Sequence, residues 1–211
     1  PSTTDLGQGT DTTSNNFETQ NTLISFYGRA IFTVANKYIL NASVRRDGSS
    51  KFGPDSRYGT FPSFSAGWVV SEESFMADVN WINNLKLRGS WGKLGNDRNV
   101  DPSNANNLFG GGPSSAYYDI NGTSTSSVQG FTATRYGNPA TGWEEDIVTN
   151  VGIDAILFKN KLDFSFEWYK KKVNGLLFNA QAGALVGGGS LPKVNIGNVE
   201  NTGFDFSATY H

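Results

Sequence analysis

Few residues in this sequence have the types and spacing that catalysis requires. The only histidine is His211, the last residue of the chain, so a Ser-His-acid triad has no suitable base. The acidic run Glu144-Glu145-Asp146 could supply paired carboxylates. We favour a solvated strand entry at a rim instead, because a rim offers little burial to shift a pKa. The sequence therefore predicts a protein that is not an enzyme and has no catalytic residues.

Residues suited to binding metals or phosphates are equally sparse. Cysteine is absent, which excludes disulfides and thiolate metal sites. Four aspartates fall in predicted loops, namely Asp47, Asp55, Asp97 and Asp101. They lack the spacing of a calcium-binding loop, and we interpret them as turn-forming residues. The glycine-rich stretches 110–115 and 186–192 lack the lysine and helix of a phosphate-binding loop. We predict no metal site and no cofactor.

The composition indicates strands and turns rather than helices. Glycine accounts for 25 of 211 residues, aromatic residues for 13% and charged residues for only 17%. A formal net charge of −2 offers no basic surface for nucleic acid. No apolar run reaches the roughly 18 residues of a transmembrane helix, which leaves transmembrane strands open. The chain begins at Pro1 without an initiating methionine or an apolar leader, so we expect a mature or truncated segment.

Seven segments alternate apolar and polar residues with the period of two that is typical of strands. They are 24–34, 38–45, 62–70, 85–92, 149–157, 162–169 and a last strand that includes 204–210. A short helical turn after a Ser71 cap is expected within 71–84. The connections alternate between short and long, the longest being 95–142. This alternation favours an up-and-down barrel with turns at one rim and loops at the other.

Charged residues keep to one face of these segments. The set is Arg29, Arg45, Lys86, Arg88, Asp154, Asp163, Glu167 and Asp205. Arg or Lys on a lipid face costs roughly 2–4 kcal/mol, so the charge-free face suits hydrocarbon. Aromatic residues gather near the segment ends as in interfacial girdles: Tyr38, Trp68, Trp91, Trp143, Trp168, Tyr169 and Tyr210. Periodicity alone does not say which face is inside, so a soluble carbohydrate-binding β-sandwich stays open beside a transmembrane barrel.

Basic and aromatic residues in the loops offer further contacts. Arg45, Arg46 and Lys51 lie near Asp47 where a strand meets a loop. They could touch an anionic substrate or lipopolysaccharide, but we favour a network of salt bridges at the rim. The aromatic residues of the longest connection are Tyr117, Tyr118, Phe131 and Tyr136. They could stack on sugar rings or form a small core within the loop, and the sequence leaves both interpretations open.

Four stretches carry motifs shared with a known family. They are YILNASVRRDGSSKFGPDSRYGTFPSFSAGWVVSEESFM (38–76), LKLRGSWGKLGN (85–96), WEEDIVTNVGIDAILFKNKLDFSFEWYKKKVNGLL (143–177) and VNIGNVENTGFDF (194–206). The last has Asp205 where the family usually has glutamate. Together they cover about half of the chain, 99 of its 211 residues. In this order they resemble the SusC/RagA-like family of TonB-dependent outer-membrane transporters.

The resemblance implies an all-β fold. We expect an antiparallel transmembrane β-barrel segment, about seven strands of a larger barrel, with long extracellular loops and short periplasmic turns. Residues 1–211 would belong to the barrel domain, with 95–142 as a long loop insertion. Seven strands cannot close around a plugged lumen without leaving unpaired edges in lipid. We therefore expect the remaining wall, the plug and the TonB-contacting segment in polypeptide outside this sequence.

The resemblance also implies TonB-dependent import of glycans, oligopeptides or similar large nutrients across the outer membrane. The expected partners are a SusD-like surface lipoprotein, TonB through the plug, outer-membrane lipid and a glycan or peptide substrate. Lumen-facing candidates for contact with substrate or plug are Asn41, Ser43, Arg45, Lys86, Arg88, Asn150, Asp154 and Glu167. The connection 95–142 is the segment that we expect to touch the lipoprotein or the ligand.

Overall fold

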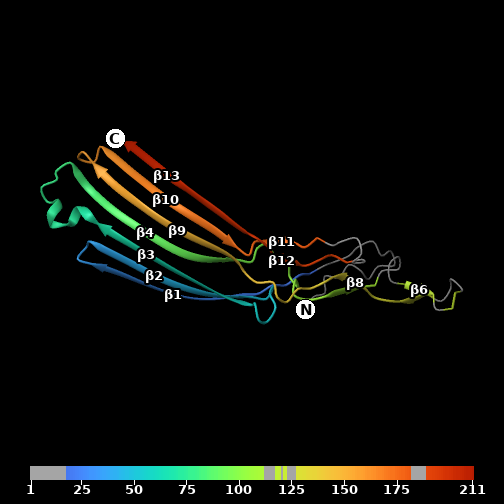
Figure 1. Ribbon diagram of the computed structural model, residues 1–211. Coiled ribbons are helices and arrows are strands. Elements are labelled where there is room, and N and C mark those ends of the chain that lie inside the picture. The colour runs from blue at the N-terminus through green and yellow to red at the C-terminus, as the bar shows by residue number, and fades with distance from the viewer. Residues whose placement is uncertain (1–17, 112–116, 120, 123–126, 182–188) are drawn as a thin grey trace.

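A seven-stranded antiparallel sheet forms the body of the protein in the computed structural model (Figure 1). The structure describes residues 18–111, 117–119, 121–122, 127–181 and 189–211. The strands are β1 (Leu23–Val34), β2 (Tyr38–Ser49), β3 (Tyr58–Val69), β4 (Ile82–Asn96), β9 (Glu144–Leu157), β10 (Leu162–Asn174) and β13 (Asn198–Tyr210). They follow one another in the sheet in chain order, and each pair is antiparallel. This up-and-down order confirms the predicted antiparallel sheet of seven strands.

The connections alternate between the two ends of the sheet, as predicted. One end, called the turn end, carries the connections 35–37, 70–81 and 158–161, of which 70–81 departs from the predicted alternation in length because it is longer than 50–57 at the other end. The other end, called the loop end, carries the connections 50–57, 97–143 and 175–197. The last two hold small two-stranded sheets: β5 (Leu108–Gly110) with β8 (Thr132–Arg135), β6 (Tyr117–Asp119) with β7 (Ser127–Gln129), and β11 (Leu177–Asn179) with β12 (Lys193–Asn195). Figure 1 shows these elements extending away from the large sheet. Whether 95–142 is an insertion stays a prediction.

Most strands are longer than the sequence pattern predicted, mainly at the loop end. β4 and β9 reach Asn96 and Glu144, beyond the expected 85–92 and 149–157. β10 likewise continues to Asn174. In these extensions both faces carry polar residues, so no alternation marks them, but the backbone hydrogen bonds between strands continue. Periodicity therefore located the apolar band of each strand rather than the whole strand.

The helical turn expected within 71–84 takes the form of short 3₁₀ turns. The connection between β3 and β4 contains two 3₁₀ turns, η1 (Val70–Glu72) and η2 (Ser74–Met76). Ser71 does not cap a helix, because it lies inside η1 and its hydroxyl has no hydrogen-bond partner. The expected Ser71 cap was therefore wrong. Among the described residues, no helix is long and apolar enough to cross a membrane.

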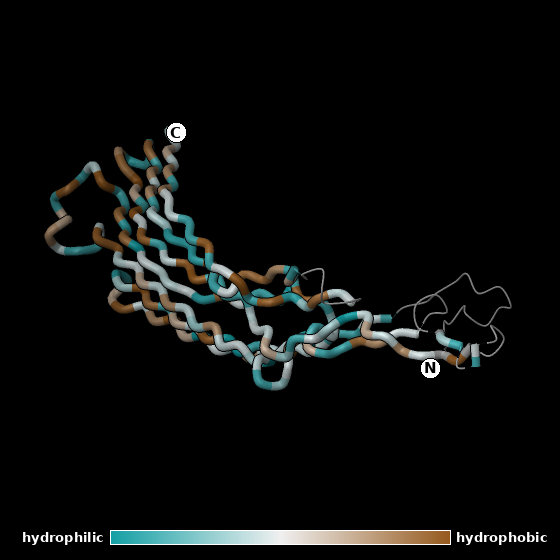
Figure 2. The backbone as a smooth tube through the Cα atoms, turned by 45° about the vertical axis from the view of Figure 1, so that its right-hand side comes forward, coloured by the Kyte–Doolittle hydropathy of each residue, from teal (hydrophilic) through white to brown (hydrophobic). Residues whose placement is uncertain are grey.

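One face of the sheet is apolar, and many of its large side chains are exposed. Residues directly opposite in the register share a face, and Leu87, Ile153, Phe166 and Phe206 form one such row across β4, β9, β10 and β13. Phe206 is 67% exposed. Figure 2 shows hydrophobic and hydrophilic residues alternating along the strands. Within the described residues no second sheet packs on this face. The β-sandwich alternative was therefore wrong about the fold.

The aromatic girdle is partly as predicted. On the apolar face Tyr38 stacks on Trp68 at the turn end, with ring centroids 6.5 Å apart. Trp91 and Trp168 also lie on that face, and Trp91 stacks on Phe64. Two predicted members do not belong to it. Tyr169 lies on the opposite face, beside Gly203, and Trp143 packs beneath the loops.

Charges appear on the apolar face only beyond its aromatic residues, towards the loop end. Lys93 and Lys172 flank Ile147, and Lys170 follows Trp168 along β10. Each lies in a strand extension that periodicity did not predict. The long methylene stems of these lysines can cover apolar surface while the ammonium groups reach water. The face is therefore free of charge in its central band, but not along the whole length of the strands.

The compact hydrophobic core lies at the base of the loops rather than in the sheet. Phe52, Val100 and Leu177 are buried together, with Trp143 packed against them. Phe61, on β3, joins through an edge-to-face contact with Trp143 at 5.4 Å between centroids. Glu144 is 5% exposed and accepts hydrogen bonds from Asn96 and the backbone of Leu177. The predicted solvated strand entry was therefore wrong for Glu144, because the loop core covers it.

Candidate functional site

All eight candidate residues lie on the second, polar face of the large sheet. They are Asn41, Ser43 and Arg45 on β2, Lys86 and Arg88 on β4, Asn150 and Asp154 on β9, and Glu167 on β10. The register places Asn41, Ser65, Ser90 and Asn150 in one row across four strands. The structure therefore brings the candidates onto one surface, while their contact with a substrate or plug stays a prediction.

The polar side chains of β2 are satisfied by their neighbours. Asn41 accepts a hydrogen bond from Arg29 at 2.8 Å and donates to Ser65 at 3.3 Å. Ser43 shares a hydrogen bond with Ser63, with the two hydroxyl oxygens 2.6 Å apart. These bonds join β1, β2 and β3 across the polar face. Asn41 and Ser43 are thus part of the wall's own hydrogen-bond ladder.

The basic residues near the loop end pair with acidic or aromatic neighbours. Arg45 Nε donates to Asp47 at 2.7 Å, and Lys51 Nζ lies 3.7 Å from Asp97. The Arg46 guanidinium lies 5.2 Å from the centre of the Tyr58 ring. This agrees with the favoured interpretation of salt bridges at the rim, with a cation–π contact in the case of Arg46.

Arg88 holds the centre of the polar face together. Its Nε donates to Asp154 at 2.9 Å, and its Nη1 pairs with Glu167 two strands away. The intervening residue is Gly152, opposite both Arg88 and Glu167 in the register. Ser165 donates to the second oxygen of Asp154 at 2.8 Å. The four charged and polar side chains therefore satisfy one another and form a brace across β4, β9 and β10.

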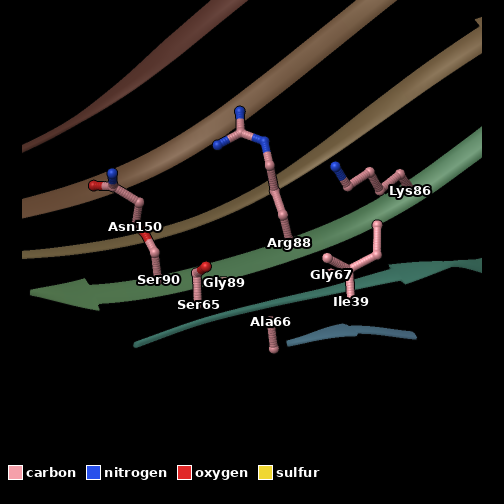
Figure 3. Close-up of a pocket in the computed structure, with 9 residues that line it drawn as sticks. All are labelled: Ile39, Ser65, Ala66, Gly67, Lys86, Arg88, Gly89, Ser90 and Asn150. Atoms are coloured by element: carbon pink, nitrogen blue, oxygen red, sulfur yellow. The ribbon is translucent and has the colours of Figure 1, made fainter. Parts of the chain in front are cut away.

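Lys86 and Asn150 differ from the other candidates because their polar groups remain free. Among the described residues Lys86 forms no ion pair, although Asp154 lies opposite in the register, because Arg88 and Ser165 already bind that carboxylate. The side-chain oxygen of Asn150 is buried and has no hydrogen-bond partner among the residues that the structure describes. Figure 3 shows both residues on the same side of the sheet as Arg88, with Ala66 on the other side.

A hollow of about 180 Å³ lies between these free groups. Its lining includes Ile39, Ser65, Gly67 and Ser90 as well as Lys86, Arg88 and Asn150. The absence of a side chain at Gly67 leaves room in the hollow, because a β-carbon there would lie 3.1 Å from Cε of Lys86. Sequence reasoning missed Ile39, Gly67 and Ser90. Only the register between strands brings them together, and single-strand periodicity contains no signal for it.

The loop aromatics are exposed rather than packed into a loop core. Phe131 is 73% exposed and Tyr118 58%. Phe109 is also exposed, and its neighbour in the β5–β8 pair is Ala133, which lies two residues after Phe131. Phe109 lies in β5, and Phe131 directly precedes β8. The side chain of Tyr117 lies outside the described residues. The interpretation as a small core inside the loop is thus wrong for Tyr118 and Phe131.

Nε2 of His211 lies 3.1 Å from the Asp163 carboxylate at the exposed turn end. Across the described ranges, no group of three or more histidine, aspartate or glutamate side chains is placed to hold a metal ion. The described strands form a wall with one apolar face and one face of hydrogen-bonded polar side chains.

This two-faced antiparallel wall defines a class of protein, the transmembrane β-barrels. Comparison with known proteins gives the family. Residues 1–211 match the family described as TonB dependent receptor-like, beta-barrel, and the chain belongs to it. It is 39% identical over 199 residues to TonB-dependent receptor P39 of Formosa agariphila, covering 94% of this chain and 17% of that protein. It is 33% identical to TonB-dependent receptor SusC of Bacteroides thetaiotaomicron, covering 90% of this chain and 19% of SusC. The chain thus spans less than one fifth of these relatives.

Solved structures show the same fold. The RagAB peptide importer in its closed-closed state matches with a TM-score of 0.77 and 26% identity, over 89% of this chain and 19% of that one. The siderophore receptor PirA from Pseudomonas aeruginosa matches with a TM-score of 0.56 and 15% identity, over 88% of this chain and 30% of that one, which shows the fold alone. Together with the family match, these likenesses confirm the resemblance to SusC- and RagA-like receptors that the sequence motifs indicated.

Proposed function

We propose that this chain is part of the wall of an outer-membrane importer that takes up glycans, oligopeptides or similar large nutrients with energy delivered through TonB. The observation that carries the proposal is the division of the sheet into an exposed apolar face and a hydrogen-bonding polar face. In a closed barrel the first contacts lipid and the second lines the passage. Support for import comes from the family and from the similarity to SusC and the RagAB peptide importer.

The edges of the sheet support a larger barrel. Within the described part of the chain, β1 and β13 each pair on one side only, and lipid does not tolerate unpaired strand edges. Further strands of the same protein would pair with both. The backbone N–H and C=O groups at the two edges of the wall would then be hydrogen-bonded to neighbouring strands, and the polar face would enclose the passage.

The partners follow from the two ends of the wall. A SusD-like surface lipoprotein would cover the loop end, and the exposed Phe109, Tyr118 and Phe131 offer it or the substrate an aromatic surface. TonB would act at the other side through a plug domain. Candidate contacts on the passage side are the eight polar-face residues, of which Lys86 and Asn150 have free polar groups.

The test is deletion of the full-length gene followed by growth on single nutrients. The panel contains purified glycans and defined oligopeptides, and uptake of a labelled form of any responsive nutrient is measured. We expect growth on one nutrient class to fail and to return with the intact gene. Uptake should also stop when TonB is deleted or the proton gradient is collapsed.

Two outcomes would contradict the proposal. One is a deletion strain that grows normally on every glycan and peptide of the panel. The other is uptake through the protein that continues without TonB. A Phe131→Ala variant of the full-length protein separates the role of the loops from that of the wall. It should reach the outer membrane at normal levels and bind the lipoprotein or nutrient less tightly.

A further inference from the structure

We infer that the hollow beside Gly67 receives a carboxylate from polypeptide of the same protein that fills the barrel, and that Lys86 forms an ion pair with it. The inference rests on the proposed function, because it assigns the polar face to the inside of a closed barrel. It goes beyond that function by separating the residues that hold the wall together from those that hold its contents.

Most of the eight candidate side chains have hydrogen-bond or ion-pair partners within the wall. Six of the eight candidates are paired within the wall: Asn41, Ser43, Arg45, Arg88, Asp154 and Glu167. Lys86 has its carboxylate neighbour taken by Arg88, and the buried oxygen of Asn150 accepts nothing. Both line the same hollow of about 180 Å³ (Figure 3). The hollow therefore offers an ammonium for an anion and an oxygen for a donor.

The Lys86 ammonium lies beside the charge-free band of the wall. On the other face of β3 and β4, beside the hollow, lie Ala66, Leu87 and Gly89, which belong to the charge-free band. Lys86 is therefore at the level of the hydrocarbon, on the inner side of the wall. If the interior is filled by protein, an unpaired ammonium and an unpaired oxygen there are costly, and both need partners. A hollow of this size has room for a single side chain.

The relatives are long enough to contain polypeptide besides the barrel wall. The structure uses 211 residues for seven strands of the large sheet. A wall of about 22 strands needs roughly three such lengths. The relatives are about five times as long as this chain, since the match covers only 17–19% of them. About two chain lengths remain for something other than wall, which is enough to fill the lumen of a plugged barrel.

The test is zero-length crosslinking of the intact full-length protein in outer membranes. A water-soluble carbodiimide activates a carboxylate, and an amine in contact with it attacks to form an amide while the urea leaves. Digestion and mass spectrometry then identify the joined peptides. We expect the Lys86 peptide to be joined to an aspartate or glutamate outside residues 1–211. Lys37 and Glu73, whose charged groups lie 3.1 Å apart, serve as the internal positive control.

Two variants complete the design. Lys86→Arg keeps the charge without a reactive amine, so the crosslink should disappear while the thermal unfolding midpoint is retained. Lys86→Met removes the charge as well as the reactive amine and should lower the thermal unfolding midpoint. A Lys86 joined to Asp154 or to another residue of this chain overturns the inference. So does a Lys86 that stays unlinked while Lys37 and Glu73 are joined. Because the crosslink reports assembly and not uptake, its result is independent of whether a nutrient is found.

Discussion

The guanidinium of Arg88 reaches across β9 directly above Gly152, and only the missing side chain of that glycine leaves room for it. A β-carbon at Gly152 would lie 2.9 Å from Cζ of Arg88 and 3.1 Å from the carbonyl oxygen of Phe166. The arginine thereby pairs with Glu167 on β10 as well as with Asp154 on β9. One glycine thus permits a brace that joins three strands.

Gly152→Ala is expected to break this brace. Arg88 would have to swing away from Glu167, and the backbone would have to shift, at a cost of roughly 1–3 kcal/mol. The measurement is urea unfolding of the full-length protein in lipid vesicles. Gly89→Ala is the matched control, because its new β-carbon would meet nothing closer than 3.9 Å. Equal stability of the two variants would show that the Arg88 brace does not support the wall.

The sidedness of the sheet can be tested with adjacent residues of β13. Phe206 lies on the apolar face and Ser207 on the polar face. Phe206→Arg should destabilise the folded full-length barrel by roughly 2–4 kcal/mol, because the charge would enter hydrocarbon. Ser207→Arg places the same charge on the inner side and should fold. The fraction folded in vesicles is read from the shift in gel mobility without heating, and the opposite order would reverse the assignment of the faces.

Sequence periodicity predicted the seven strands and, in their central band, the face on which their charges lie, because both follow from local alternation. It missed the brace at Gly152 and the hollow at Gly67, since each depends on which residues lie opposite one another on neighbouring strands. It also missed the buried Glu144, which only the loop core explains. The family motifs indicated the barrel, but they do not predict which polar side chains lack a partner within the wall.

Glu73 makes the turn end sensitive to acid. Its carboxylate accepts hydrogen bonds from Tyr38 at 2.7 Å, Trp68 at 3.1 Å and Lys37 at 3.1 Å. The bond from Tyr38, followed by those from Trp68 and Lys37, holds the pKa of Glu73 below its usual value of 4.5. The charged form therefore stabilises the fold above about pH 4.5, and this contribution is lost as the pH falls through the lowered pKa.

Glu73→Gln should accordingly reduce the loss of stability on acidification. The measurement is the thermal unfolding midpoint of the full-length protein between neutral pH and pH 3, with Glu72→Gln as the control. Glu72 is the exposed neighbour of Glu73 in the same connection. The prediction fails if the wild-type protein and both variants lose the same amount of stability over this range.

The turn between β9 and β10 contains three consecutive residues with positive φ: Phe158 at 56°, Lys159 at 60° and Asn160 at 65°. Asn83 supports them by accepting the backbone N–H of Lys159 at 2.8 Å. Left-handed backbone costs roughly 1–2 kcal/mol for a residue with a side chain. Glycine avoids that strain but loses roughly 0.5–1 kcal/mol of chain entropy.

Lys159→Gly is therefore expected to stabilise the full-length protein by up to about 1 kcal/mol. Lys161→Gly, two residues later and without a positive φ, should destabilise it instead. Chemical unfolding in vesicles measures both variants against the wild type. A destabilising Lys159→Gly would mean that the lysine side chain contributes more than the strain that it imposes.

Asn104 ties the longest connection to the strand before β13. Its side chain is 1% exposed, accepts the backbone N–H of Lys193 at 2.8 Å and donates to the Lys193 carbonyl at 3.2 Å and to Thr141 at 3.1 Å. Asn104→Ala would remove the acceptor of the Lys193 N–H, at a cost of roughly 1–3 kcal/mol confined to the loops. The Lys193 carbonyl would keep its hydrogen bond from Thr141 at 2.6 Å. Hydrogen exchange of the Lys193 amide should accelerate, while the amides of β9 and β10 keep their protection. Asn106→Ala, at an exposed position, should leave both unchanged. Faster exchange throughout the large sheet would instead show that the loop core and the wall unfold as one unit.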